Sequence, residues 1–229
     1  MTLADPGHSP ARTFLDYRLY LVTDTGLSRA RPTVRVVTEA LRGGVTVVQY
    51  REKTAGTRAM IEEARELRAL CRAAGVPFIV NDRVDVALAV DADGVHVGQD
   101  DMPAALARRI IGPEKILGIS AVDPEEAGRA EAEGADYIGA SPIFATPTKT
   151  DAPPAMGVEG LRRLAAAVRI PVVAIGGMNA GNSAAMMAAG AAGVAVVSAI
   201  VAADNVEEAA RAVRRAVDAG LSARLHSSR

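Results

Sequence analysis

The stretch AMIEEARELRALCRAAGVPFIV, residues 59–80, contains the structural unit that decides the fold. Over residues 59–73, apolar side chains recur at helical spacing with charged ones between them, which predicts an amphipathic helix. The apolar stripe consists of Ile61, Ala64, Leu67, Leu70 and Cys71. Gly75 supplies the left-handed residue that commonly ends a helix, and the apolar run after Pro77 predicts a short buried strand.

The same order of helix, glycine and short β-branched run recurs along the chain. We expect helix-ending glycines at Gly44, Gly134 and Gly190, and a further helix over residues 158–168. Short runs rich in Val and Ile between turn residues are typical of strands buried on both faces of a parallel sheet. The predicted strands cover residues 19–22, 45–48, 78–80, 95–97, 116–119, 137–139, 172–175 and 194–197.

Eight strands that alternate with helices are typical of a closed (βα)8 barrel or of an open doubly wound sheet. The strand count and even spacing favour the barrel. In addition, residues 23–26 after the first strand read TDTG, whereas an open dinucleotide-binding sheet carries G-x-G-x-x-G at this position. We predict an α/β fold, a single (βα)8 TIM barrel over residues 18–220, with an extra N-terminal segment (1–17) lying against it and a C-terminal tail (221–229).

The composition of the 229-residue chain excludes several classes of partner. A hydrophobic fraction of 49% and a charged fraction of 23% argue against disorder. The net charge of −1 gives no general attraction to nucleic acid or to an anionic membrane. Cys71 is the only cysteine, and residues 1–13 lack the apolar core of a secretion signal. We expect a cytoplasmic protein that binds neither nucleic acid nor membrane.

The segment QYREK, residues 49–53, ends the second predicted strand. Side chains two residues apart in a strand point the same way, so Gln49, Arg51 and Lys53 project together. An amide, a guanidinium and an ammonium group on one side suit a polyphosphate. An ordinary exposed strand end with surface charges explains the motif equally well at this point.

Two pairs of polar residues follow neighbouring strands. Asn81 and Asp82 follow the third strand, and Asp100 and Asp101 follow the fourth. Carboxylates on adjacent loops repel one another unless a cation lies between them, and Mg²⁺ bound by carboxylates and substrate oxygens is a common diphosphate-binding arrangement. The alternative is that Asp82 and Asp101 each cap the helix that follows.

The remaining candidates lie after the later strands. Ser120 ends the fifth strand and either contacts a phosphate or caps a helix. The loop after the sixth strand contains Lys149. The Gly176–Gly177 turn and Ser198 follow the last two strands, where barrels of this class commonly bind phosphate on backbone N–H groups at helix N-termini. His96 is expected to be a core or lumen-lining residue without a catalytic role.

Seven motifs in order resemble the thiamine-phosphate synthase family over residues 18–205. The motifs are LYLVTD (19–24), QYREK (49–53), VNDRVD (80–85), GVHVGQDDMP (94–103), ATPTKTDAPP (145–154), AIGGM (174–178) and VVSAI (196–200). The resemblance implies a transferase that joins a hydroxymethylpyrimidine diphosphate to a thiazole phosphate, with Mg²⁺ as cofactor, in thiamine biosynthesis. Ser141 and Met178 depart from the Gly and Ile that are frequent in the family, and neither change removes a polar contact.

The resemblance also implies a role for each matched residue. The pyrimidine diphosphate is expected to bind Gln49, Tyr50, Arg51, Glu52, Lys53 and Asn81. Asp82 and Asp101 are expected to hold Mg²⁺, and Ser120 to contact the diphosphate. The thiazole phosphate or the leaving group is expected to meet Thr146, Pro147, Thr148 and Lys149. The thiazole phosphate is expected to bind Gly177, Val197 and Ser198.

We hypothesise that Mg²⁺, Arg51, Lys53, Ser120 and Lys149 act in catalysis. They would stabilise the charge that develops on the departing diphosphate. The C–O bond would break before the thiazole nitrogen adds, because the aminopyrimidine ring can delocalise the resulting methylene cation. A thiazole tautomerase of similar fold has no need for a diphosphate and Mg²⁺ site. A non-catalytic phosphate-ligand sensor, and phosphosugar or tryptophan-pathway barrels that use a carboxylate acid/base pair, are further alternatives. The sequence leaves the oligomeric state open.

Overall fold

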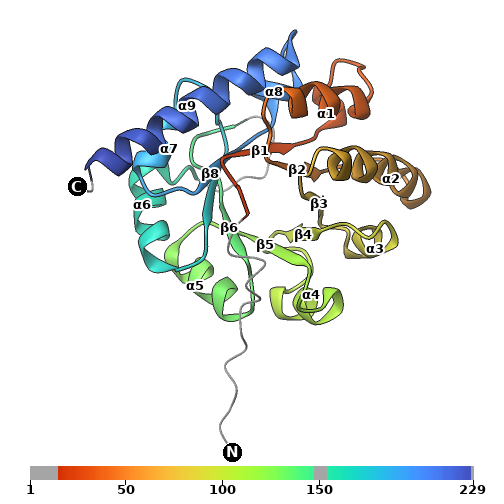
Figure 1. Ribbon diagram of the computed structural model, residues 1–229. Coiled ribbons are helices and arrows are strands. Elements are labelled where there is room, and N and C mark those ends of the chain that lie inside the picture. The colour runs from red at the N-terminus through yellow and green to blue at the C-terminus, as the bar shows by residue number, and fades with distance from the viewer. Residues whose placement is uncertain (1–14, 147–153, 228–229) are drawn as a thin grey trace, which may run out of the picture.

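The computed structural model describes residues 15–146 and 154–227, and these form a closed parallel barrel. Its strands follow chain order around the barrel, and β8 pairs with β1 to close it (Figure 1). The strands are β1 (Leu19–Val22), β2 (Val47–Tyr50), β3 (Phe78–Asn81), β4 (Gly94–Val97), β5 (Ile116–Ala121), β6 (Tyr137–Ala140), β7 (Val172–Ile175) and β8 (Gly193–Val196). The predicted (βα)8 barrel is confirmed.

Helices surround the barrel on its outer side (Figure 1). They are the 3-10 turn η2 (Thr25–Leu27) and the helices α1 (Thr33–Arg42), α2 (Thr57–Ala73), α3 (Val84–Ala89), α4 (Ala104–Ile111), α5 (Pro124–Ala132), α6 (Gly157–Ala167), α7 (Ser183–Ala188), α8 (Ser198–Val201) and α9 (Val206–Ser227). Among the described residues, no helix is both long and apolar enough to cross a membrane.

The repeating unit of helix, glycine and strand has the backbone that the sequence predicts. Gly44, Gly75, Gly134 and Gly190 all have positive φ angles, between 68° and 106°. In α2 the buried stripe consists of Met60, Ala64, Leu67 and Cys71, and the predicted Ile61 and Leu70 are only partly buried. These left-handed glycines turn each chain segment from its helix back toward the next strand.

The core consists of two layers that the strands separate. The outer layer lies between strands and helices, and the inner one fills the barrel lumen. The lumen cluster consists of Tyr17, Tyr20, Val22, Val47, Ile79, Ile116, Tyr137, Val173 and Ala195. The Tyr17 ring packs against the Tyr137 ring at an interplanar angle of 39°, with the ring centroids 5.0 Å apart, so the end of the predicted N-terminal segment packs on the barrel. Residues 1–14 lie outside the described part.

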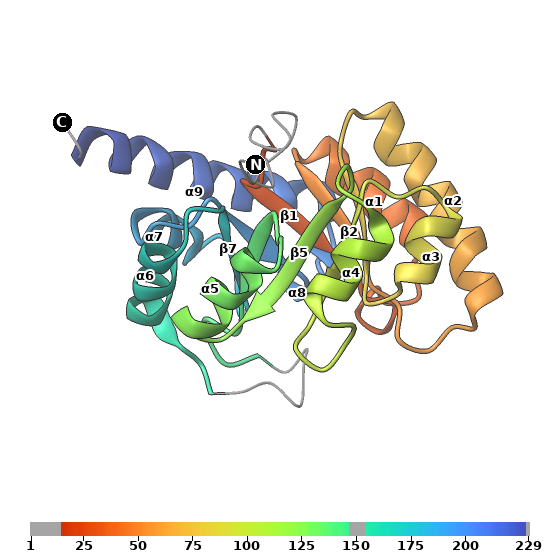
Figure 2. The ribbon, with the colours of Figure 1, turned by 90° about the horizontal axis from the view of Figure 1, so that it is seen from below.

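The predicted C-terminal tail differs from what the structure contains. Helix α9 continues to Ser227, so residues 221–227 are helical (Figure 2). Leu221 is partly buried against the core, and α9 packs along α7 and α1. Packing against other helices stabilises a helix beyond what its own sequence pattern suggests.

Gly118 of β5 leaves room for the Tyr137 ring inside the barrel. A Cβ atom at position 118 would lie 2.1 Å from Cζ of Tyr137. We expect Gly118→Ala to lower the free energy of unfolding by about 1–3 kcal/mol, because the buried ring must shift. Denaturant unfolding measures this change. Gly128→Ala in α5 is the matched control: its Cβ meets nothing within 4 Å, and it should be neutral or stabilising. Equal losses in both variants would contradict the prediction.

Candidate active site

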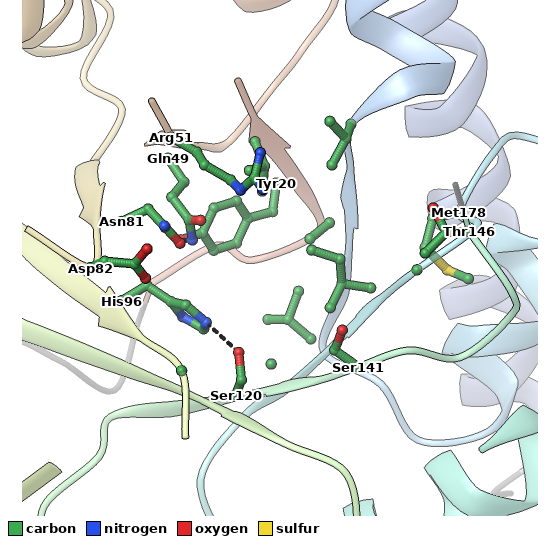
Figure 3. A pocket seen from close by; sticks show the side chains of 18 of the residues that line it. Tyr20, Gln49, Arg51, Asn81, Asp82, His96, Ser120, Ser141, Thr146 and Met178 are labelled. Carbon is green, nitrogen blue, oxygen red and sulfur yellow. Dashed lines mark hydrogen bonds between the residues drawn. The ribbon is translucent and has the colours of Figure 1, made fainter. Parts of the chain in front are cut away.

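A cavity of about 280 Å³ opens where the strands end and their following loops begin. Figure 3 shows Arg51, Asn81 and Asp82 on one side of this cavity, with Thr146 and Met178 on the other. The predicted site residues that line it are Gln49, Arg51, Lys53, Asn81, Asp82, Asp101, Ser120, Thr146, Gly177, Val197 and Ser198. Loops from both halves of the chain therefore meet around one space.

Tyr50 and Glu52 were predicted to contact substrate, but their side chains do not line the cavity. The Tyr50 ring is 1% exposed in the outer core layer, and its hydroxyl donates to Glu63 of α2 at 2.8 Å. The Glu52 carboxylate accepts hydrogen bonds from the Thr25 hydroxyl and from the backbone N–H of Thr54, at 2.6 Å each. Both side chains stabilise the loop that carries Arg51. The predictions for Pro147, Thr148 and Lys149 lie outside the described residues.

Arg51 is held by residues that follow β1. Its backbone N–H donates to the Thr23 hydroxyl at 2.9 Å, and its guanidinium Nη1 lies 2.8 Å from an Asp24 carboxylate oxygen. The Arg51 and Asp24 side chains are 22% and 16% exposed, so this ion pair is largely shielded from water. Asp24 lies in the LYLVTD motif, but its pairing with Arg51 was not predicted from the sequence.

The carboxyl groups of Asp82 and Asp101 lie close to one another in the cavity wall. Burial of the Asp82 carboxyl, together with the neighbouring Asp101, raises the pKa of Asp82, while an ion pair with Lys53 opposes that rise. Asp82 also has a φ of 58°, a left-handed conformation that non-glycine residues seldom adopt. Asp101 accepts a hydrogen bond from the backbone N–H of Gly98 at 2.8 Å. Such strain and charge crowding are typical of functional sites.

Neither aspartate caps the helix that follows it. Helix α3 begins after Arg83 and α4 after Pro103, and neither helix has a side-chain cap. The helix-cap alternative for Asp82 and Asp101 is therefore wrong. Within residues 15–146 and 154–227, no group of three or more His, Cys, Asp or Glu side chains is placed to hold a metal ion by itself. Any cation here would need oxygens from a bound molecule as well as the two carboxylates.

Ser120 contacts a histidine instead of capping a helix. Its hydroxyl lies 3.0 Å from Nε2 of His96 (Figure 3), and the cap of α5 is Asp123. His96 lines the lumen as predicted. It also reaches the cavity, where its Nδ1 lies 2.9 Å from the Tyr137 hydroxyl. No residue pattern predicts these two contacts, because the partners are 24 and 41 positions away along the chain.

The loop after β7 brings backbone close to the cavity. Gly176 and Gly177 have φ angles of 100° and 70°, and a Cβ at Gly177 would lie 2.9 Å from Cβ of Phe144. The carbonyl of Gly177 accepts from the Asn182 side chain at 2.9 Å, which fixes the turn. Helices α7 and α8, which follow these loops, are short, with six and four residues.

A (βα)8 barrel with charged side chains and a glycine turn around one cavity at the strand ends has the architecture of a TIM-barrel enzyme. A family model described as thiamine monophosphate synthase matches residues 19–200. The thiamine-phosphate synthase of Chloroflexus aurantiacus is 64% identical over 203 residues, which cover 89% of this chain and 94% of the relative. That of Moorella thermoacetica is 53% identical over 199 residues, covering 87% and 95%.

A solved structure of thiamine phosphate pyrophosphorylase from Pyrococcus furiosus superimposes with a TM-score of 0.84 at 44% identity, covering 92% of this chain and 99% of that one. The chain belongs to the thiamine-phosphate synthase family, and it is a transferase. The resemblance that the motifs indicate is thereby confirmed.

Proposed function

We propose that this enzyme joins a hydroxymethylpyrimidine diphosphate to a thiazole phosphate in a Mg²⁺-dependent reaction that releases diphosphate and forms thiamine phosphate. The proposal rests on one observation. The same cavity is lined by two cationic and two acidic side chains, those of Arg51, Lys53, Asp82 and Asp101. Two cationic side chains beside two crowded carboxylates suit a diphosphate with a divalent cation, whereas a monophosphate alone gives no reason for the carboxylates.

The carboxylates of Asp82 and Asp101 fit Mg²⁺ by chemistry and number. Mg²⁺ commonly binds through one or two carboxylates and completes its shell with water and substrate phosphate oxygens. The raised pKa of Asp82 reflects the burial and the neighbouring charge that a divalent cation would compensate. When bound, the ion would supply positive charge to the diphosphate. Lys53 now pairs with Asp82 and would turn toward a diphosphate oxygen.

The proposed reaction begins with departure of the diphosphate. The bond between the pyrimidine methylene carbon and the diphosphate oxygen breaks, and its electron pair leaves with the diphosphate. Arg51 and Lys53 stabilise that negative charge, with Lys149 as a further predicted contributor outside the described residues. The Arg51 guanidinium is preorganised for this task because Asp24 holds it at 2.8 Å.

The thiazole ring nitrogen then adds to the methylene carbon with its lone pair. Gly177, Val197 and Ser198 would hold the thiazole phosphate, and Thr146 lies on the same side of the cavity as Met178, which follows Gly177 in the chain (Figure 3). Anchoring a distant phosphate aligns the nitrogen without contacts at the reacting atoms. The nitrogen needs no deprotonation, so the proposal requires no general base.

Purified protein with both phosphorylated heterocycles tests this proposal. With Mg²⁺ we expect thiamine phosphate and diphosphate in equal amounts. Excess EDTA should stop both, and added Mg²⁺ should restore them. A tautomerase or a ligand sensor would release no diphosphate. Full coupling in EDTA would contradict the metal assignment while leaving the transferase class intact.

A further inference from the structure

A chain of polar side chains crosses the barrel lumen directly beneath the cavity. The amide nitrogen of Gln49 donates to the Tyr20 hydroxyl at 2.9 Å, and that hydroxyl lies 2.7 Å from the Tyr137 hydroxyl. Tyr137 lies 2.9 Å from Nδ1 of His96, whose Nε2 lies 3.0 Å from the Ser120 hydroxyl. The contacts join β2, β1, β6, β4 and β5 in one line, and all five side chains border the floor of the cavity.

Two glycines make space for the rings in this chain. A Cβ at Gly118 would collide with the phenol of Tyr137, and a Cβ at Gly139 would lie 3.0 Å from Cε1 of His96. Gly118 lies on β5, next to the strand that carries Tyr137, whereas Gly139 lies on β6, two strands away from His96 on β4. The His96 ring and the Tyr137 ring are thus confined by backbone and not only by one another.

Burial favours the neutral form of each ring in the chain. Tyr20 and Tyr137 are 1% exposed, and burial raises the pKa of both phenols. His96 is 8% exposed, and its ring lies between two hydroxyl groups. A neutral imidazole has one N–H and one acceptor nitrogen, so His96 donates on one side and accepts on the other.

The Gln49 end favours one direction for the hydrogen bonds. The Gln49 amide nitrogen donates to the Tyr20 oxygen, which favours a Tyr20 hydroxyl that gives its own hydrogen to Tyr137. Tyr137 would then donate to Nδ1 of His96, and the His96 hydrogen would lie on Nε2. If the hydrogen bonds ran in the opposite direction, the Tyr20 oxygen would accept from both Gln49 and Tyr137. The Tyr20 hydrogen would then have no acceptor among these five side chains.

We propose that His96 is a positioning residue that donates its Nε2 hydrogen to Ser120, so that the Ser120 hydroxyl donates its own hydrogen into the cavity. A hydroxyl fixed in this way recognises an acceptor, and an anionic diphosphate oxygen is the strongest one that the proposed reaction places there. This inference rests on the proposed function only for the identity of that acceptor. The tautomer follows from the lumen chain alone.

The first test reads the tautomer without any substrate. The protein contains three histidines, so nitrogen-15 labelling gives a small set of ring signals, and those that disappear in His96→Gln belong to His96. We expect protonated Nε2 and unprotonated Nδ1 in the wild type. Tyr137→Phe removes the donor to Nδ1 and should weaken that preference. A protonated Nδ1 in the wild type would overturn the proposal even if the enzyme is fully active.

The second test asks whether His96 acts through Ser120. We expect His96→Leu to lower kcat/KM for thiamine phosphate formation by about tenfold, as for one lost hydrogen bond to a charged group. His96→Gln keeps a side-chain N–H and should recover most of that loss. In a Ser120→Ala background, His96→Leu should cost less than about twofold, because contacting residues couple in a double-mutant cycle.

Equal losses from His96→Leu in both backgrounds would show that His96 acts without Ser120 and would overturn the positioning role. Circular dichroism of each variant separates this outcome from misfolding. If the wild type forms no thiamine phosphate at all, the proposed function fails, and the tautomer measurement still decides the hydrogen-bond direction. The two proposals therefore fail by different observations.

Discussion

Asp82→Asn is expected to lower kcat for thiamine phosphate formation by about 10³-fold or more while leaving the fold intact. The substitution removes one of the two carboxylates proposed to hold Mg²⁺, and each tenfold loss corresponds to about 1.4 kcal/mol of transition-state stabilisation. Asparagine suits the site better than alanine because Asp82 has a φ of 58°, and asparagine tolerates that conformation. Steady-state kinetics at saturating Mg²⁺ measures the effect.

Asp91→Asn is the matched control for this variant. Asp91 also has a positive φ, 51°, but its side chain is 84% exposed and pairs with Lys115 away from the cavity. We expect wild-type kinetics from it. If Asp82→Asn turned over at the wild-type rate with Mg²⁺, the assignment of Asp82 to the metal would be wrong.

Arg51→Gln is expected to lower kcat/KM by about 10²–10³-fold, in line with the loss of a preorganised group that stabilises developing charge. Arg51 has the necessary geometry because Asp24 holds its guanidinium at the cavity wall. The variant also leaves the Asp24 carboxylate without its partner, which adds repulsion toward diphosphate. Arg51→Lys keeps the charge but loses the planar fork, so an intermediate rate is expected.

Arg83→Gln provides the comparison for Arg51. Arg83 follows the neighbouring strand, but its guanidinium pairs with Asp85 and donates to Thr57 on the outer side. Both variants lose one positive charge, so a general electrostatic effect would slow them alike. A loss for Arg83→Gln as large as that for Arg51→Gln would contradict a local role for Arg51.

The barrel was predictable because buried parallel strands leave a simple pattern. Strands β1 and β7 coincide with their predicted runs, and the helix-ending glycines have the predicted positive φ angles. The period of two along a strand also placed Gln49, Arg51 and Lys53 on one side. The same rule places Tyr50 and Glu52 on the other side, where the structure has them; their expected contact with substrate came from family resemblance instead.

The contacts between side chains within the site could not be predicted from the sequence. The hydroxyls of Tyr20 and Tyr137 meet at 2.7 Å although the residues are 117 positions apart. The pairing of Asp24 with Arg51 likewise depends on how two loops close over adjacent strands. Residue patterns show which face a side chain occupies, but the contact between two side chains depends on barrel closure and ring packing.

The central claim is that Asp82 and Asp101 hold a divalent cation that binds a diphosphate. A crystal structure with Mn²⁺ and diphosphate, with data collected for anomalous scattering of manganese, tests it most directly. We predict an anomalous peak within ligand distance of both carboxylates and of diphosphate oxygens, with Arg51 on the same diphosphate. Diphosphate bound in the cavity with no manganese at these two aspartates would contradict the claim.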